Sequence, residues 1–230
     1  FRRVLFRSPF EATWDCFKRE FLGKWYRTPS IRNGKTEFLL HATFGIFWTT
    51  MTALLFRRSI LKRTGLFRID RRNQSDEDWA MRSSLCSDIA FIPERLATWR
   101  RHEQQSTISA NDLESMKLVT LNAQTVLAEM PAEIPSAWKQ LPNWEHRICG
   151  LWQQAYWDHF RLYRGNIVHQ PRLFAKGAWA AARLEPSWLL RQTVRGFPWP
   201  AAPFADQITH ARELIAQLHA TWPPQAVTTW

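Results

Sequence analysis

The sequence predicts an α/β fold up to about residue 110, followed by an all-helical region over residues 111–230. Two patterns carry this prediction. In the first part, short apolar segments with the composition of buried strands alternate with segments that have helical periodicity. After Ser109, apolar side chains recur at helical spacing over long stretches, for example over residues 144–160. Residues 1–8 resemble a translated sequencing adapter and are set aside as a scar, so the first predicted domain is residues 9–110.

The first predicted elements surround a turn-rich loop. Apolar side chains at every third or fourth position predict an amphipathic helix over residues 10–26. Pro29 and the Asn-Gly pair at residues 33–34 predict a chain reversal over residues 28–35. We expect a short helix over residues 37–47 and a buried strand over residues 48–57.

The next elements are delimited by caps and turn residues. Ser59 is predicted to cap a short helix that ends at Gly65, which suits a left-handed backbone. Ser75 or Asp76 is predicted to cap a helix that runs to about Leu85, with acidic residues in its exposed first turn. Residues 89–92 and 96–99 are predicted strands, and the tail after the Pro-Pro pair at residues 223–224 is predicted to be mobile.

Charge and cysteine content limit the environment and the partners. The formal charge of +11 and the pI near 10.3 favour an anionic partner. The three cysteines have no spacing that suits zinc, which favours a reducing, cytoplasmic location. The longest apolar stretch, residues 44–56, is shorter than the ~20 residues that cross a bilayer, and no secretory signal is recognised.

Five short motifs follow one another between residues 55 and 102. They are Leu55-Phe56-Arg57-Arg58, Gly65-Leu66-Phe67, Glu77-Asp78-Trp79, Phe91-Ile92-Pro93-Glu94 and Trp99-Arg100-Arg101-His102. In this order and spacing they resemble the distal half of family-two glycosyltransferases, which have the GT-A fold. The resemblance covers about residues 38 to 106. It departs from the family at Arg68-Ile69, where an acidic pair is usual, and at Arg82, which lies closer to Asp78 than the family's helix arginine.

The resemblance implies an inverting enzyme that transfers a sugar from a nucleotide-sugar donor to a glycan or glycolipid acceptor. It assigns the role of general base to Asp78, with Glu77 as its acidic neighbour. It also makes Arg100 and His102 candidates for contact with the diphosphate or a metal. An aromatic face suits the apolar face of a pyranose, and Trp79 is the tryptophan expected to stack on a sugar ring because it adjoins the proposed base. A divalent cation, Mg²⁺ or Mn²⁺, is expected to be held mainly by an N-terminal half that this chain lacks. The chain as given is therefore expected to be inactive, and its residues 48–100 are expected to form a sheet edge with an exposed apolar face.

Other interpretations of the same residues stay open. Asp76-Glu77-Asp78 fits an Asp-x-Asp metal pattern by letter, but polar residues precede it where the family has a hydrophobic strand. The acids are otherwise ordinary residues of a helix start, and most tryptophans are core residues. A second class of function is a basic helical module that binds nucleic acid or an acidic membrane. The sequence contains no nucleic-acid-binding motif that would support nucleic acid as the partner. Peripheral association with the inner face of the membrane stays an alternative. A transferase-like domain without activity is a third reading.

Overall fold

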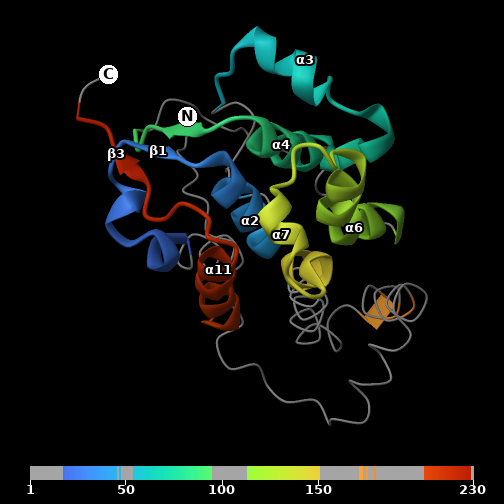
Figure 1. Cartoon of the computed structure of the whole chain (residues 1–230). Coiled ribbons are helices and arrows are strands. Elements are labelled where there is room, and N and C mark those ends of the chain that lie inside the picture. Colours follow the sequence, from blue (N-terminus) through green and yellow to red (C-terminus); the bar gives the residue numbers. More distant parts are fainter. Residues whose placement is uncertain are drawn as a thin grey trace.

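The computed structural model describes residues 18–45, 47, 54–94, 113–150, 171, 172, 175, 179 and 205–228. Within them, a small antiparallel sheet lies at one side of a helical body. Figure 1 shows the strands on one side, helices α2 and α4 at the centre, and helices α6 and α7 on the other side. The predicted combination of strands and helices is therefore present, although helices predominate.

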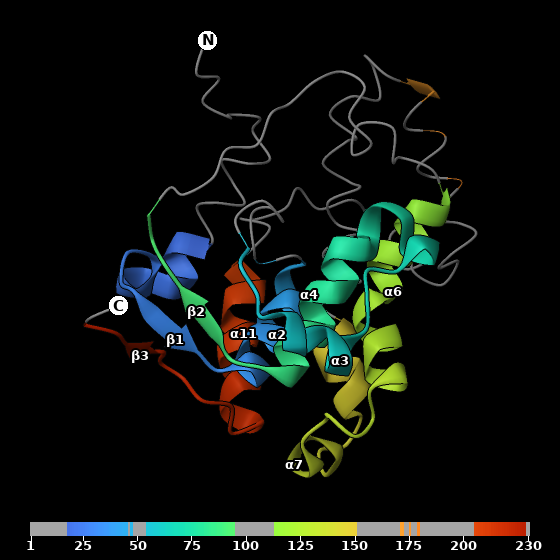
Figure 2. The ribbon, with the colours of Figure 1, turned by 90° about the horizontal axis from the view of Figure 1, so that it is seen from above.

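The sheet has the strand order β2-β1-β3, and both pairings are antiparallel. Strand β1 is Ser30–Arg32, β2 is Ile89–Phe91 and β3 is Gln225–Ala226. Ile31 of β1 lies opposite Ala90 on one side and Gln225 on the other. Figure 2 shows the three strands next to one another. The prediction of a mobile tail after residue 224 is therefore wrong, because β3 uses its backbone to extend the sheet.

Strand β1 also corrects the predicted loop over residues 28–35. The Asn33 side chain accepts a hydrogen bond from the backbone N–H of Thr36 at 3.3 Å, so Asn33 caps a helix rather than forming a hairpin turn. Helix α2 runs over Gly34–Phe44, three residues earlier at each end than predicted. All of its residues except Lys35 are buried, as expected for a helix that passes through the core.

Helix α4, Ser75–Cys86, packs against α2. Its predicted start and end are confirmed, although the preceding residue, Gln74, makes no side-chain cap. Before it lie three shorter elements: η3 (Arg58–Ile60), α3 (Leu61–Thr64) and η4 (Ile69–Gln74). Gly65 ends α3 with φ at +71°, as predicted, whereas Ser59 lies within η3 instead of capping a helix.

The C-terminal region is mostly helical in its described parts. It contains α6 (Leu113–Glu129), α7 (Ser136–Lys139), a helical segment at residues 144–150, and α11 (Ala205–Gln217). Apolar residues of α2, α4, α6 and α11 belong to one core cluster. At the other end of the chain, residues 18–22 are helical and continue into η1 (Gly23–Tyr26), which confirms the described part of the first predicted helix.

The expected exposed face over residues 48–100 is present in a different form. Residues 48–53 and 95–100 lie outside the described residues. Of the rest, the most exposed large apolar side chains, Leu55, Leu66 and Ile69, lie in the segments before and after α3, whereas the less exposed Ile92 directly follows the edge strand β2. Among the described residues, no helix has both the length and the apolar composition needed to cross a bilayer.

The close approach of α2 to the end of α4 gives a testable prediction. A Cβ atom at Gly34 would lie 2.0 Å from the carbonyl oxygen of Ser87 and 2.3 Å from that of Ser84. Alanine normally stabilises a helix by ~1 kcal/mol relative to glycine. Here the backbone clash dominates, and we expect Gly34→Ala to lower the free energy of unfolding by about 1–3 kcal/mol in urea denaturation.

Gly150→Ala is the matched control, because the nearest atoms to its added Cβ belong to the exposed, movable side chain of His146. Equal stability changes in the two variants would contradict the close packing of α2 on α4.

Candidate functional site at the start of α4

The three motif residues at the start of α4 are buried. Glu77, Asp78 and Trp79 have exposed fractions of 5%, 0% and 2%. The interpretation of the acids as exposed first-turn residues is therefore wrong. A buried carboxylate needs a compensating partner, because its desolvation is costly.

Arg82 provides that partner for Asp78. Its Nε and Nη2 atoms donate to Oδ2 of Asp78 at 2.9 and 2.6 Å, across one helical turn. Arg82 also donates to the backbone carbonyls of Thr64 and Leu66. It therefore connects α4 with the turn at the end of α3, which the sequence did not reveal.

A second arginine approaches the other oxygen of the same carboxylate. Arg71 of η4 places Nε 3.9 Å from Oδ1 of Asp78, and its Nη2 donates to Glu129 of α6 at 3.2 Å. Arg68 also contacts Glu129 and donates to Asp70 at 2.9 Å. Oδ1 of Asp78 accepts no hydrogen bond in the described structure. One oxygen is thus fixed by a bidentate arginine, while the other has free lone pairs.

Glu77 has a different environment. Burial is the main cause that raises the pKa of Glu77, the charges of Asp76 and Asp78 add to the rise, and the side chain of Asn122 on α6 opposes it; together they raise the pKa to about 8. Glu77 is therefore largely protonated at neutral pH. Within the described residues, an ion pair with a nearby arginine is formed by Asp78 and not by Glu77.

Trp79 contacts two phenylalanine rings. The centroid of its ring lies 4.7 Å from that of Phe56 and 5.0 Å from that of Phe67, which is stacked on it. Its indole Nε1 has no hydrogen-bond partner in the described structure. In this arrangement Trp79 holds the two ends of the segment from 56 to 67 together, and its expected contact with a sugar stays a prediction.

The remaining predicted site residues lie elsewhere. Arg100 and His102 are outside the described residues, so their expected contacts with diphosphate or metal stay predictions. Among the residues that are described, no group of three or more His, Cys, Asp or Glu side chains could hold a metal ion. Asp78 forms an ion pair with Arg82, and Asp76 and Asp78 are not part of such a group.

No protein-family model, curated protein or solved structure matches this chain.

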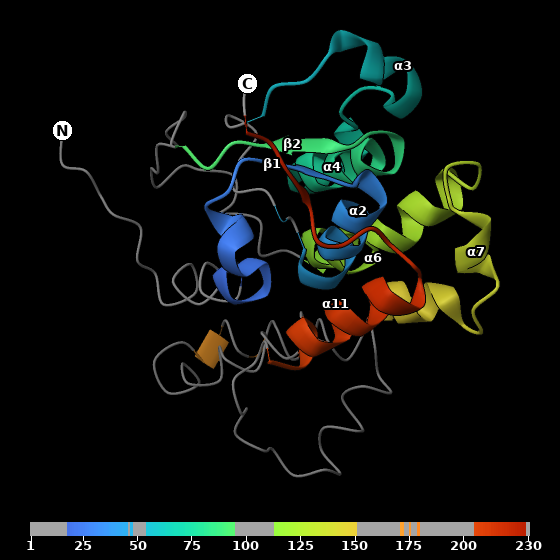
Figure 3. The ribbon, with the colours of Figure 1, turned by 60° about the vertical axis from the view of Figure 1, so that its left-hand side comes forward.

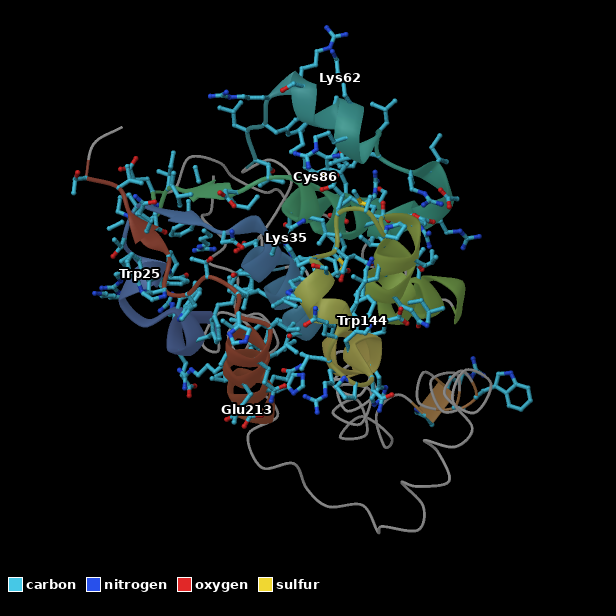
Figure 4. The ribbon with its side chains drawn as sticks, viewed as in Figure 1. Trp25, Lys35, Lys62, Cys86, Trp144 and Glu213 are labelled. Atoms are coloured by element: carbon cyan, nitrogen blue, oxygen red, sulfur yellow. The ribbon has the colours of Figure 1, made fainter. Side chains whose placement is uncertain are left out.

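The opposite end of α4 forms a recess of about 380 Å³ with a structural role. Lys35 donates to the backbone carbonyls of Leu85 and Glu133, and Arg63 donates to that of Cys86 at 2.5 Å. Figure 4 shows Lys35 and Cys86 in this region. The two cations satisfy the last carbonyls of α4 and complement the negative end of its dipole. Lys35 and Arg63 also form ion pairs with the Glu133 carboxylate, so the charged side chains that line the recess are paired with one another.

The raised pKa of Glu77 predicts a pH-dependent stability. Its folded-state pKa exceeds the ordinary value, so its contribution is present at low pH and is lost as pH rises from about 4.5 to 8. Buried His41, whose pKa is lowered to about 3, destabilises the fold below pH 6.5, so the clearest window is from 6.5 to 8. Across it, we expect the wild type to lose about 1–2 kcal/mol relative to Glu77→Gln.

Chemical denaturation at several pH values measures this difference. Glu213→Gln is the control, because Glu213 is exposed on α11 (Figure 4) and its neutralisation should give no such trend. A pH-independent difference between the wild type and Glu77→Gln would contradict the protonated state of Glu77.

Proposed function

We propose that the chain acts in nucleotide-sugar-dependent glycosyl transfer, with Asp78 as the general base. Two features support the proposal: the ordered motifs between residues 55 and 102, and the geometry of the Asp78 carboxylate. The proposal depends mainly on the second feature, the geometry of the Asp78 carboxylate. Arg82 fixes one carboxylate oxygen, and the other accepts no hydrogen bond in the described structure, which suits a base that must meet a hydroxyl in one orientation.

The proposed step is a single displacement. Oδ1 of Asp78 takes the proton of the acceptor hydroxyl while the hydroxyl oxygen attacks the anomeric carbon of the donor. Nucleoside diphosphate leaves from the opposite face, so the configuration of the sugar is inverted. A divalent cation, when bound, neutralises charge on the departing diphosphate.

The environment of Asp78 sets two conditions on this step. Arg82 holds Oδ2 of the carboxylate with two hydrogen bonds, so Oδ1 is the oxygen left to accept a proton. The carboxylate is fully covered, so an acceptor reaches it only when the covering side chains move. Phe56 and Phe67, which are partly exposed, pack on the neighbouring Trp79.

The proposal also includes the fold family, the acceptor, the metal ion, the location and the role of Glu77. The mixed helices and strands are compatible with a GT-A domain without identifying one. The glycan or glycolipid acceptor, the Mg²⁺ or Mn²⁺ ion and the cytoplasmic location all follow from the resemblance and the composition. Glu77, protonated near neutral pH, is a neighbour of the base and not a second base.

Removal of the base can be separated from loss of structure by using azide as the acceptor. Azide carries no proton, so its attack on the donor needs no general base. In an active form of the protein, we expect Asp78→Asn to lower kcat for hydroxyl acceptors by ~10²–10⁴-fold. Formation of the glycosyl azide should be retained. Product analysis by mass spectrometry measures both reactions.

The stability of the same variant must be measured alongside. Because Asp78 is buried beside Arg82, Asp78→Asn should cost about 3–5 kcal/mol, so assays belong well below its melting temperature. Equal loss of the hydroxyl and azide reactions would assign Asp78 a structural role.

A further inference from the structure

Residues 54–72, which we call the basic arm, form a separate feature of the surface. The arm contains η3, α3 and the first four residues of η4. In Figures 1 and 3, α3 lies at the outer edge of the molecule, far from α11. The proposed transfer reaction uses none of its charged side chains.

The arm carries a concentrated positive charge. It has one acidic residue, Asp70, and seven basic residues: Arg57, Arg58, Lys62, Arg63, Arg68, Arg71 and Arg72. Several of these cations are engaged in ion pairs with Glu133, Asp70 and Glu129. Arg57, Arg58 and Lys62 are exposed, and no carboxylate of the described chain lies within ion-pair distance of them. Figure 4 shows Lys62 pointing away from the body of the protein.

Exposed aliphatic side chains accompany these cations. Leu55 is 101% exposed, Ile69 is 95% exposed and Leu66 is 70% exposed. The rings of Phe56 and Phe67 both contact Trp79. Leu55 and Leu66 are the residues directly before these two phenylalanines, so their backbone lies on the same part of the surface. Large apolar side chains gathered in this way mark an interaction surface.

The arm is held in place by the body of the protein. Arg82 donates to carbonyls of Thr64 and Leu66, and Arg63 donates to the carbonyl of Cys86 and to Glu133. These bonds orient the arm without using the three unpaired cations. The surface is therefore organised before a partner binds, which lowers the entropic cost of binding.

We propose that the basic arm docks the protein on an anionic lipid bilayer. A bilayer interface offers negative headgroups to Arg57, Arg58 and Lys62, and an apolar layer to Leu55 and Leu66. A single-stranded nucleic acid is a poorer fit, because its bases stack on aromatic side chains, whereas the most exposed apolar residues of the arm are aliphatic. This proposal is independent of the transfer reaction.

Vesicle flotation of the full chain tests the proposal. We expect binding to phosphatidylcholine vesicles that contain phosphatidylserine, weakening with salt, and little binding to phosphatidylcholine alone. Each basic side chain near an anionic leaflet contributes about a fivefold factor, so the triple variant Arg57→Gln, Arg58→Gln, Lys62→Gln should bind about a hundredfold more weakly. Leu55→Ser with Leu66→Ser should weaken binding about tenfold or more.

The matched control removes the same number of charges elsewhere. Lys24, Arg27 and Arg212 are exposed and lie outside the arm, and their triple substitution by glutamine should leave most of the binding. The altered side chains are exposed, so melting curves should be unchanged and folding does not limit the test.

Four results would overturn the proposal. The first is absence of wild-type binding to the anionic vesicles, and the second is an equal loss in the control variant. The third is binding that depends on the three cations but not on Leu55 and Leu66, which indicates a general polyanion site such as one for nucleic acid. The fourth is a wild-type dimer that the leucine variant abolishes, which assigns the surface to a second copy of the chain.

Discussion

The ion pair between Asp78 and Arg82 is the interaction on which the described structure most depends. A carboxylate with no exposed surface is tolerated only beside a cation, and Arg82 is that cation. Loss of one partner of such a pair costs about 3–5 kcal/mol, a large share of the roughly 5–15 kcal/mol that stabilises a domain. Because Arg82 also holds the carbonyls of Thr64 and Leu66, the pair connects the interior of α4 with the basic arm.

This connection relates two surfaces that have different proposed roles. Inside, Arg82 fixes one oxygen of Asp78 and leaves the other to meet an acceptor. Outside, the same guanidinium steadies the turn after α3, from which Phe67 reaches back over Trp79. A protein that modifies a glycolipid would gain from this arrangement, since docking on lipid brings the acceptor to the enzyme.

The sequence predicted local features better than distant ones. The acidic first turn of α4 and the glycine after α3 are local signals, and the structure confirms both elements. Strand β1 was missed because three residues become a strand only beside Ile89–Phe91 and Gln225–Ala226, which are far away in the chain. Burial of the acids was missed because α4 has no clear apolar stripe in its sequence. The four-residue spacing of Asp78 and Arg82 suits an ion pair on one helix face, but such a spacing does not show whether the pair is exposed or buried.

A double-mutant cycle on Asp78→Asn and Arg82→Met tests the central role of the ion pair most directly. The free energy of unfolding of the wild type, both single variants and the double variant is measured by urea denaturation near neutral pH. We expect the double variant to lose less free energy of unfolding than the two single variants lose together, with a coupling free energy of about 2–3 kcal/mol. Single losses that add within ~0.5 kcal/mol would show that the two side chains do not stabilise one another, and would contradict the account.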